Sequence, residues 1–77
     1  MPVKAFVLIE VEVGESGNVV DKVRSLTYVT SANMLIGPYD VVAVVEVAEF
    51  AMVNDIVDRI QSISGVLKTT TLLCAKL

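Results

Sequence analysis

The chain has 77 residues, of which 55% are hydrophobic, and its six basic and nine acidic residues give a net charge of −3. This length fits a single domain, residues 1–77, and the lack of a Lys and Arg surplus argues against direct binding of nucleic acid. The sequence has no histidine and one cysteine, Cys74, which excludes an internal disulfide and argues against a metal site, and we expect no cofactor.

The high apolar content is the first feature that needs an explanation. A globule of this size has too little interior to bury so many apolar side chains, and the mean hydropathy is +0.73. The apolar run at residues 5–9 is far shorter than the ~20 residues that span a bilayer, and the first residues lack the pattern of a signal peptide. We therefore expect a cytoplasmic protein without a membrane segment, which buries its apolar surplus against further copies of itself.

Residues 4–13 are predicted to form the first strand. The odd positions are all apolar: Ala5, Val7, Ile9, Val11 and Val13. The even positions begin with Phe6 and Leu8 and become acidic at Glu10. A strand with this pattern is buried along the whole of one face and along half of the other. We expect one face to meet helices and the other face to meet another sheet.

The next segment predicts a short helix and then a strand with irregular alternation. Apolar residues recur at helical spacing at Val19, Val20, Val23 and Leu26. Ser16 is the candidate N-cap of this helix. Residues 27–36 have the composition of a strand, but their alternation fails at residues 31–33, which predicts a bulge or an edge strand.

The second half of the chain begins with a Gly-Pro turn at residues 37–38. The near-continuous apolar segment 41–47 is typical of a central strand that is covered on both faces. Residues 49–63 carry the clearest amphipathic helix pattern, and Gly65 is expected to end this helix in the left-handed C′ conformation. Residues 66–77 are predicted to form the last strand.

The resulting order, β-α-β-β-α-β, is the ferredoxin-like arrangement of the α+β class, with a four-stranded antiparallel sheet. A weak internal repeat between residues 8–11 and 44–47 supports two halves, and the first and third strands should lie at the sheet centre. Their odd positions would face the helices, while their even positions leave an apolar sheet face uncovered: Phe6, Leu8, Val42 and Val44. We expect sheet-on-sheet dimerisation to bury this face, so that no stable monomer exists.

Signals of catalysis are weak in this sequence. The chain has no serine elbow, P-loop or glycine-rich dinucleotide motif. Glu10 and Glu46 would be neighbours on the exposed sheet face if the repeat holds, and paired carboxylates can serve as acid and base. The alternative, which we favour, places both at a wet rim where Lys68 or Lys76 neutralises them. We therefore expect that the protein is not an enzyme.

The turn after the second predicted strand is the most promising binding feature. It offers backbone N–H groups at Gly37, Tyr39 and Asp40, together with a phenol and a carboxylate. N–H groups can hold the carboxylate of a zwitterion, and an acidic side chain can hold its ammonium group. A plain turn, with a packed tyrosine and an aspartate that caps the backbone, fits the same residues equally well. Thr69 and Thr71 share one face of the last strand within reach of a ligand, although a threonine run is also typical of strands in general.

Several motifs follow one another in a fixed order: Gly37-x-Tyr39-Asp40, the apolar segment 41–47, Asn54-x-x-Val57-x-x-Ile60, Ile63-x-Gly65-Val66 and Thr69-x-Thr71-x-Leu73. In this order and spacing, over residues 5–77, the chain resembles the effector-binding (RAM) domain of Lrp/AsnC-type regulators of transcription. The resemblance implies a dimeric α/β barrel made of two facing sheets, assembly of dimers into rings, and amino-acid effectors bound between dimers. It also implies the ligand-binding positions, which are Gly37, Tyr39, Asp40, Thr69 and Thr71.

One departure from that family concerns the N-terminus. Full-length members carry a helix-turn-helix there, whereas this chain starts directly at its first predicted strand. We therefore expect a stand-alone module that modulates transcription or metabolism by binding its effector or by mixed assembly with full-length Lrp/AsnC-type regulators. Two alternatives stay open: an enzyme of the dimeric α/β-barrel type, such as a cofactor-free monooxygenase, and a purely structural oligomerisation unit. The enzyme should carry a polar cluster inside the barrel, and the expected interior is apolar.

Overall fold

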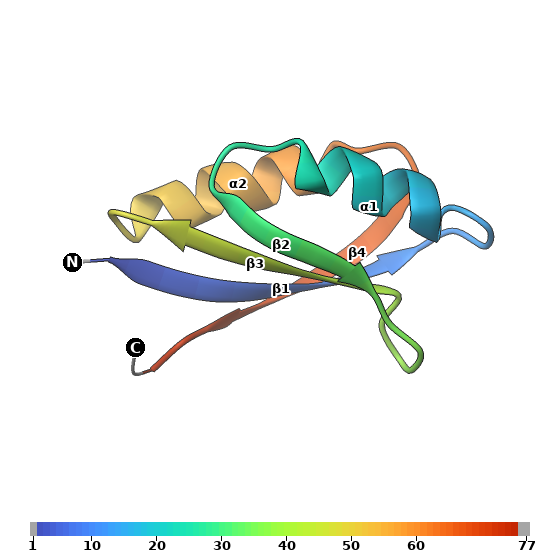
Figure 1. Ribbon diagram of the computed structural model, residues 1–77, viewed down its shortest axis with the longest axis horizontal. Coiled ribbons are helices and arrows are strands. Elements are labelled where there is room, and N and C mark those ends of the chain that lie inside the picture. The colour runs from blue at the N-terminus through green and yellow to red at the C-terminus, as the bar shows by residue number, and fades with distance from the viewer. Residues whose placement is uncertain (1, 76–77) are drawn as a thin grey trace.

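The computed structural model describes residues 2–75, which form six elements of secondary structure (Figure 1). In chain order these are β1 (Val3–Val11), α1 (Ser16–Arg24), β2 (Val29–Met34), β3 (Val41–Val47), α2 (Ala51–Gln61) and β4 (Val66–Leu73). This order confirms the predicted ferredoxin-like arrangement. Neither helix in this part of the chain is long and apolar enough to cross a membrane.

The four strands form one antiparallel sheet in the order β2-β3-β1-β4. The strands β1 and β3 lie at the centre, as predicted, and Phe6 is paired with Val44 across them. On the other side of β1, Phe6 is paired with Leu72 of the edge strand β4. Both helices cover the same face of the sheet, so the molecule has two layers (Figure 1).

The core fills the space between the sheet and the two helices. It is built from the odd positions of the central strands, among which Val7, Ile9 and Val45 are fully buried. The helices add Val23 and Ile60, which are fully buried as well. Side chains alternate between the two faces of a strand, so every second residue of β1 and β3 reaches this layer. The predicted helix-facing positions of both strands are thereby confirmed from Val3 to Val11 and from Val41 to Val47.

The strand β1 is shorter than predicted, and Val13 does not belong to its buried face. The strand ends at Val11, after which Gly14 adopts φ +83° and the chain turns toward α1. Val13 is fully exposed as a result. Apolar alternation alone does not show where a left-handed glycine stops a strand. The strand β4 likewise ends at Leu73, and residues 76–77 of the predicted last strand lie outside the described part of the chain.

The helix ends differ from the predicted caps. Glu15 is the N-cap of α1, because its carbonyl accepts the first helical hydrogen bond, from the N–H of Val19 at 2.9 Å. Ser16 is therefore the first helical residue. Helix α2 already ends at Gln61, so Gly65 lies beyond the C′ position, in the second of two turns that lead to β4. Gly65 still adopts a left-handed conformation, with φ +98°.

The strand β2 is an irregular edge strand, as predicted. Its register with β3 shifts between Val29 and Ser31, just before the residues at which the alternation of the sequence fails. The guanidinium Nε of Arg24 donates a hydrogen bond to the carbonyl oxygen of Ala32 at 2.9 Å. Helix α1 thereby ties down the edge strand that leads into the β2–β3 turn.

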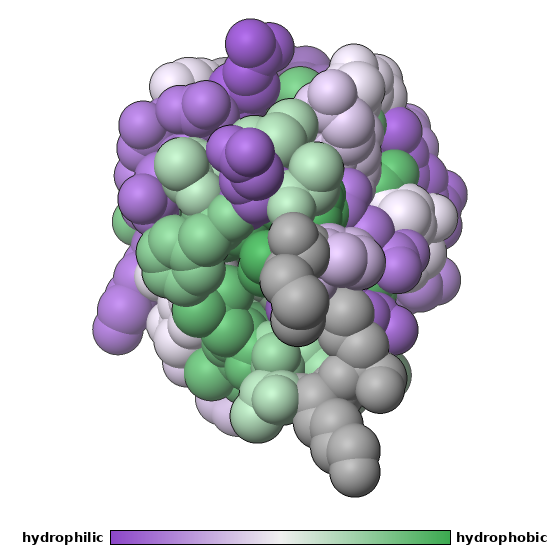
Figure 2. Space-filling model, turned by 90° about the vertical axis from the view of Figure 1, so that its left-hand side faces the viewer, coloured by the Kyte–Doolittle hydropathy of each residue, from purple (hydrophilic) through white to green (hydrophobic). Residues whose placement is uncertain are grey.

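Within residues 2–75, no helix covers the second face of the sheet, and this face is apolar at its centre. It contains the four predicted residues Phe6, Leu8, Val42 and Val44, which are only half-buried, together with Leu72 of β4. We call these five residues the open face. Figure 2 shows apolar side chains gathered below the polar helix layer, at the end of the molecule that carries the termini. The predicted uncovered face is thus confirmed.

Glu10 and Glu46 are not neighbours on the open side of the sheet. The register places Glu46 opposite Lys4 and Glu10 opposite Lys68. Because β1 and β3 run antiparallel, residues that match in the internal repeat lie near opposite ends of the sheet. The two carboxylates therefore cannot act as one acid–base pair, and each lies across from a lysine.

Candidate functional site

The loop between β2 and β3 closes with a hydrogen bond between its two ends. The N–H of Leu35 donates to the carbonyl oxygen of Asp40 at 2.8 Å. Gly37 lies inside this loop with φ +154°, and an added Cβ would meet nothing within 4 Å. The loop therefore needs glycine here for its backbone conformation and not for lack of space.

Asp40 is bound to the end of β1 by two hydrogen bonds. Its N–H donates to the carbonyl oxygen of Ile9 at 2.9 Å, and its Oδ2 accepts from the N–H of Val11 at 2.8 Å. The carboxylate thus caps the backbone, as the plain-turn interpretation predicts. Its other oxygen, Oδ1, accepts no hydrogen bond from residues 2–75. A carboxylate has about four acceptor positions, so Asp40 can hold a ligand donor and keep this cap.

Tyr39 joins the turn to the edge strand β4. Its hydroxyl lies 3.3 Å from Oγ1 of Thr70, at hydrogen-bond distance, and the side chain is half-buried. Thr70 is paired with Leu8, so it lies on the same side of the sheet as the open face. No local pattern in the sequence marks Thr70, because the register between β1 and β4 decides which threonines reach this side.

Thr69 and Thr71 share one face of β4, as predicted, but it is the face that carries the helices. They are paired with Ile9 and Val7, whose side chains lie in the core. The hydroxyl of Thr69 accepts a hydrogen bond from Nε2 of Gln61 at 2.8 Å. Of the five predicted ligand-binding residues, the structure therefore gathers Gly37, Tyr39 and Asp40 in one turn and places the two threonines on the other side of the sheet.

Several polar groups of the turn have no hydrogen-bond partner among the described residues. Within residues 2–75, the N–H groups of Gly37 and Tyr39 donate no hydrogen bond, whereas the N–H of Asp40 is bound to Ile9. Two backbone donors and the Oδ1 atom of Asp40 therefore remain for a ligand with a carboxylate and an ammonium group. The described residues contain no cluster of three or more side chains that could hold a metal ion.

Comparison with known proteins assigns this fold to one family. The model of the Lrp/AsnC ligand binding domain matches residues 4–76. The crystal structure of TTHA0845 from Thermus thermophilus is 32% identical in sequence and superposes with a TM-score of 0.92, over 97% of this chain and 95% of that chain. No curated protein matches the chain in sequence.

Two longer proteins contain a domain of the same fold. AsnC of E. coli is 23% identical with a TM-score of 0.88, over 97% of this chain and 52% of AsnC. The transcriptional regulator NMB0573 of Neisseria meningitidis, solved as a complex with L-Met, is 19% identical with a TM-score of 0.83, over 96% of this chain and 50% of that chain. The chain spans about half the length of these two proteins, and at this identity they show the fold alone. Since the family model matches nearly every residue, the chain belongs to the family of Lrp/AsnC ligand-binding domains.

Proposed function

We propose that the chain is a regulatory module that binds an amino acid at the β2–β3 turn and acts as an oligomer. Its family consists of ligand-binding domains, and the NMB0573 regulator, which shares the fold, binds L-Met in its solved complex. The main support for the proposal is that the turn combines fixed side chains with unpaired polar groups. Tyr39 and Asp40 are held by neighbouring strands, while two N–H groups and one carboxylate oxygen make no hydrogen bond with residues 2–75. Such fixed, unpaired groups lower the ordering cost of binding.

The proposed contacts follow from the charges of a zwitterion. The N–H groups of Gly37 and Tyr39 bind the carboxylate of the amino acid, and Oδ1 of Asp40 binds its ammonium group. Thr69 and Thr71 belong to the proposed site because of the family resemblance. Both lie on the helix-facing side of an edge strand, so a ligand would reach them along the free edge of β4.

Self-association is the second part of the proposal. The open face is apolar and uncovered, and burying apolar surface yields about 25 cal/mol per Å², or several kcal/mol for five such side chains. We infer a dimer in which two open faces meet. The turn also exposes apolar side chains that further contacts between copies would bury. Ile36, beside Gly37, is fully exposed, and Met34 is 63% exposed. Contacts between dimers at this loop would enclose the turn and so form a pocket around the proposed binding groups.

Regulation would follow from the dependence of the site on assembly. A ligand that binds only the assembled form stabilises that form by mass action. Mixed assembly with full-length Lrp/AsnC-type regulators would pass this signal on to transcription. The proposal assigns no catalytic role, since the centre of the open face consists of apolar side chains.

A thermal-shift screen of the purified protein with the twenty amino acids tests the proposal. A ligand at a hundredfold excess over its Kd adds about 2.7 kcal/mol to the free energy of unfolding, so a true effector gives a clear shift. The matched variant is Asp40→Asn, which keeps an oxygen for the N–H of Val11 and removes the charge. We expect the shift to disappear in this variant. A screen in which no amino acid raises the midpoint would contradict the proposal.

A further inference from the structure

A cavity lies between α2 and the connection from α1 to β2, at the end of β2 away from the Gly37 turn. Its volume is about 260 Å³, and its lining consists of Thr27, Tyr28, Met52, Asp55, Ile56 and Arg59. None of these residues belongs to the β2–β3 turn. We propose that this cavity is a separate binding site for a small aromatic carboxylic acid, and that Tyr28 serves as its wall.

The backbone of Tyr28 is the first observation that points to a function. Its φ is +75°, and no other residue of the described chain apart from glycine has a positive φ. For a bulky L-residue this left-handed conformation is unfavourable. The surrounding turn enforces it, because the N–H of Glu46 donates to the carbonyl oxygen of Tyr28 at 3.1 Å and the N–H of Val29 donates to that of Leu26 at 3.3 Å.

The same turn occurs a second time in the fold, between α2 and β4, and there the equivalent residue is Gly65. Its φ is +98°. The N–H of Glu12 donates to the carbonyl oxygen of Gly65 at 2.8 Å, and the N–H of Val66 donates to that of Ile63 at 3.2 Å. Backbone conformation and hydrogen bonds therefore match those of Tyr28. One copy of this turn uses the residue that fits it without strain, and the other copy uses a tyrosine.

The surroundings of the two turns differ in one respect. At Gly65, an added Cβ would lie 3.1 Å from Cβ of Glu15, so a side chain would press against Glu15. At Tyr28, the side chain borders the 260 Å³ cavity, and 48% of the residue's surface is exposed. A tyrosine that is only half-buried gains less from packing than a fully buried one, so packing alone is a weak reason to keep a strained residue here. Backbone outliers that persist beside a cavity are typical of binding sites.

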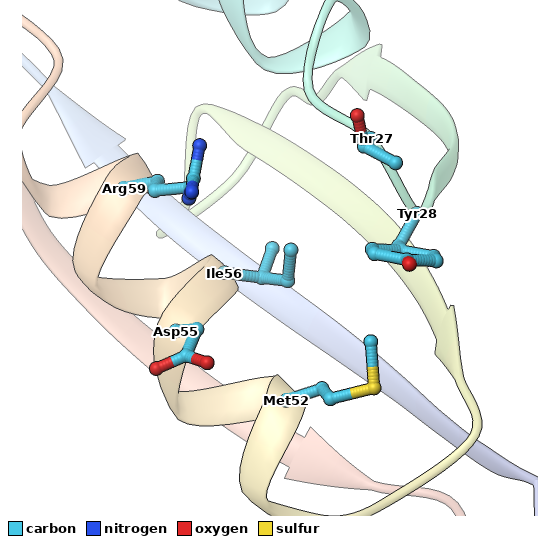
Figure 3. Close-up of a pocket in the computed structure, with 6 residues that line it drawn as sticks. All are labelled: Thr27, Tyr28, Met52, Asp55, Ile56 and Arg59. Carbon is cyan, nitrogen blue, oxygen red and sulfur yellow. The ribbon is translucent and has the colours of Figure 1, made fainter.

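The side chains in the cavity form a polar end and an apolar floor (Figure 3). Ile56 and Met52 point from α2 toward the ring of Tyr28, and Ile56 is almost fully buried. The guanidinium group of Arg59 lies at the end of the cavity that faces Thr27, and it makes no hydrogen bond or ion pair with residues 2–75. Figure 3 also shows that Asp55 turns its carboxylate away from Tyr28.

This arrangement selects the class of ligand. The guanidinium fork of Arg59 matches a carboxylate in two parallel hydrogen bonds, and the hydroxyl of Thr27 adds another donor. An aromatic body would then lie over Ile56, against the ring of Tyr28 and the thioether of Met52, both of which make favourable contacts with aromatic rings. A volume of 260 Å³ is below the range of about 300–1,000 Å³ for drug-sized ligands, so it fits a small metabolite with one ring.

Titration calorimetry with phenylacetate as the probe tests this site in the full chain. We expect saturable binding of phenylacetate and none of its neutral isostere phenylacetamide. Arg59→Gln should weaken phenylacetate binding by about tenfold or more, because it removes a charge-assisted contact. Lys22→Gln is the matched control, since it removes one positive charge from the last turn of the other helix, and it should leave the affinity unchanged.

Tyr28→Gly separates a binding role from a structural one. The turn already accepts glycine at Gly65, so the variant should fold, while phenylacetate binding should fall at least as much as in Arg59→Gln. Tyr28→Asn repeats the test with a residue that also tolerates the left-handed conformation. Asp40→Asn should leave phenylacetate binding intact, which keeps this site distinguishable from the amino-acid site at the turn. The inference is overturned if the wild type shows no saturable binding, if the Tyr28 variants bind as well as the wild type, or if Asp40→Asn abolishes binding.

Discussion

The carboxylate of Asp40 accepts a hydrogen bond from the backbone N–H of Val11, 29 positions earlier in the sequence, at a distance of 2.8 Å. This contact fixes the β2–β3 turn against the end of β1, where the sheet stops and the chain leaves toward α1. The residue proposed to bind the ammonium group of a ligand is therefore also a structural cap. Substitutions at Asp40 have to be chosen so that these two roles come apart.

Stability measurements on two Asp40 variants separate the roles. Asp40→Ala leaves the partly buried N–H of Val11 without its acceptor, which should lower the free energy of unfolding by about 1–3 kcal/mol. Asp40→Asn retains an oxygen for this hydrogen bond and should cost less than half as much. Urea denaturation followed by circular dichroism measures both. Equal stability of Asp40→Ala and the wild type would show that the Asp40–Val11 hydrogen bond does not contribute to the free energy of unfolding.

If two open faces form the dimer interface, a lysine on the open face should disrupt the oligomer. Leu8→Lys would place a charge in the centre of two facing sheets, where burying it without a partner costs several kcal/mol. We expect the wild type to sediment as a dimer or larger at micromolar concentration. The variant should sediment as a monomer that has lost folded structure, because no stable monomer is expected. Leu67→Lys is the control, because Leu67 is 63% exposed on β4 and is not part of the open face. A folded wild-type monomer at micromolar concentration would refute the dimer.

The two equivalent turns predict different responses to substitution. Gly65→Ala should lower the free energy of unfolding by about 1–3 kcal/mol, because alanine takes φ +98° only with strain and its Cβ approaches Glu15. Tyr28→Gly should lower it by less than Gly65→Ala does, since relief of strain offsets much of the lost packing and of the greater freedom of the unfolded chain. Thermal or urea unfolding of both variants checks this contrast. A large loss in Tyr28→Gly would instead identify Tyr28 as a packing residue.

Substitutions of the threonines of β4 test which side of the sheet takes part in amino-acid binding. Thr70→Val removes the partner of the Tyr39 hydroxyl and should weaken amino-acid binding by loosening the turn. Thr69→Val and Thr71→Val test the residues proposed from the family resemblance. If the ligand reaches them along the edge of β4, each should weaken binding by about tenfold, the value of one hydrogen bond of about 1.4 kcal/mol. Unchanged titration curves for both would remove these two threonines from the site.

Much of the fold could be predicted because hydrophobic patterns encode it directly. The segment 41–47 is apolar throughout except for Glu46, and β3 has those bounds, since a central strand with apolar residues on both faces gives one near-continuous apolar segment. The even positions of β1 predicted the open face, because alternation has a fixed period of two. Hydrophobic patterns do not encode the ends of strands and helices, as Val13 and Gly65 show, since turns that need a left-handed residue interrupt a pattern without changing its composition.

The candidate site depends on relations that local patterns do not contain. The sequence placed Gly37, Tyr39 and Asp40 in one turn, which the structure confirms. It did not reveal that Thr70 is the threonine beside Tyr39, because this depends on the register between two strands that are about 60 residues apart in the chain. The left-handed conformation of Tyr28 could not be predicted either, since a tyrosine in the sequence does not indicate a positive φ. The structure shows it directly, and Gly65 adopts a positive φ in the equivalent turn.

Calorimetric titration of the wild type with the best amino acid from the thermal-shift screen is the most direct test of the proposed function. We expect saturable binding in the oligomer. We also expect Asp40→Asn to lower the affinity by at least about tenfold, because it removes one charge-assisted contact. Saturable binding that Asp40→Asn leaves unchanged would move the site away from the turn. No heat of binding with any of the twenty amino acids would contradict the central claim that this chain is an amino-acid sensor.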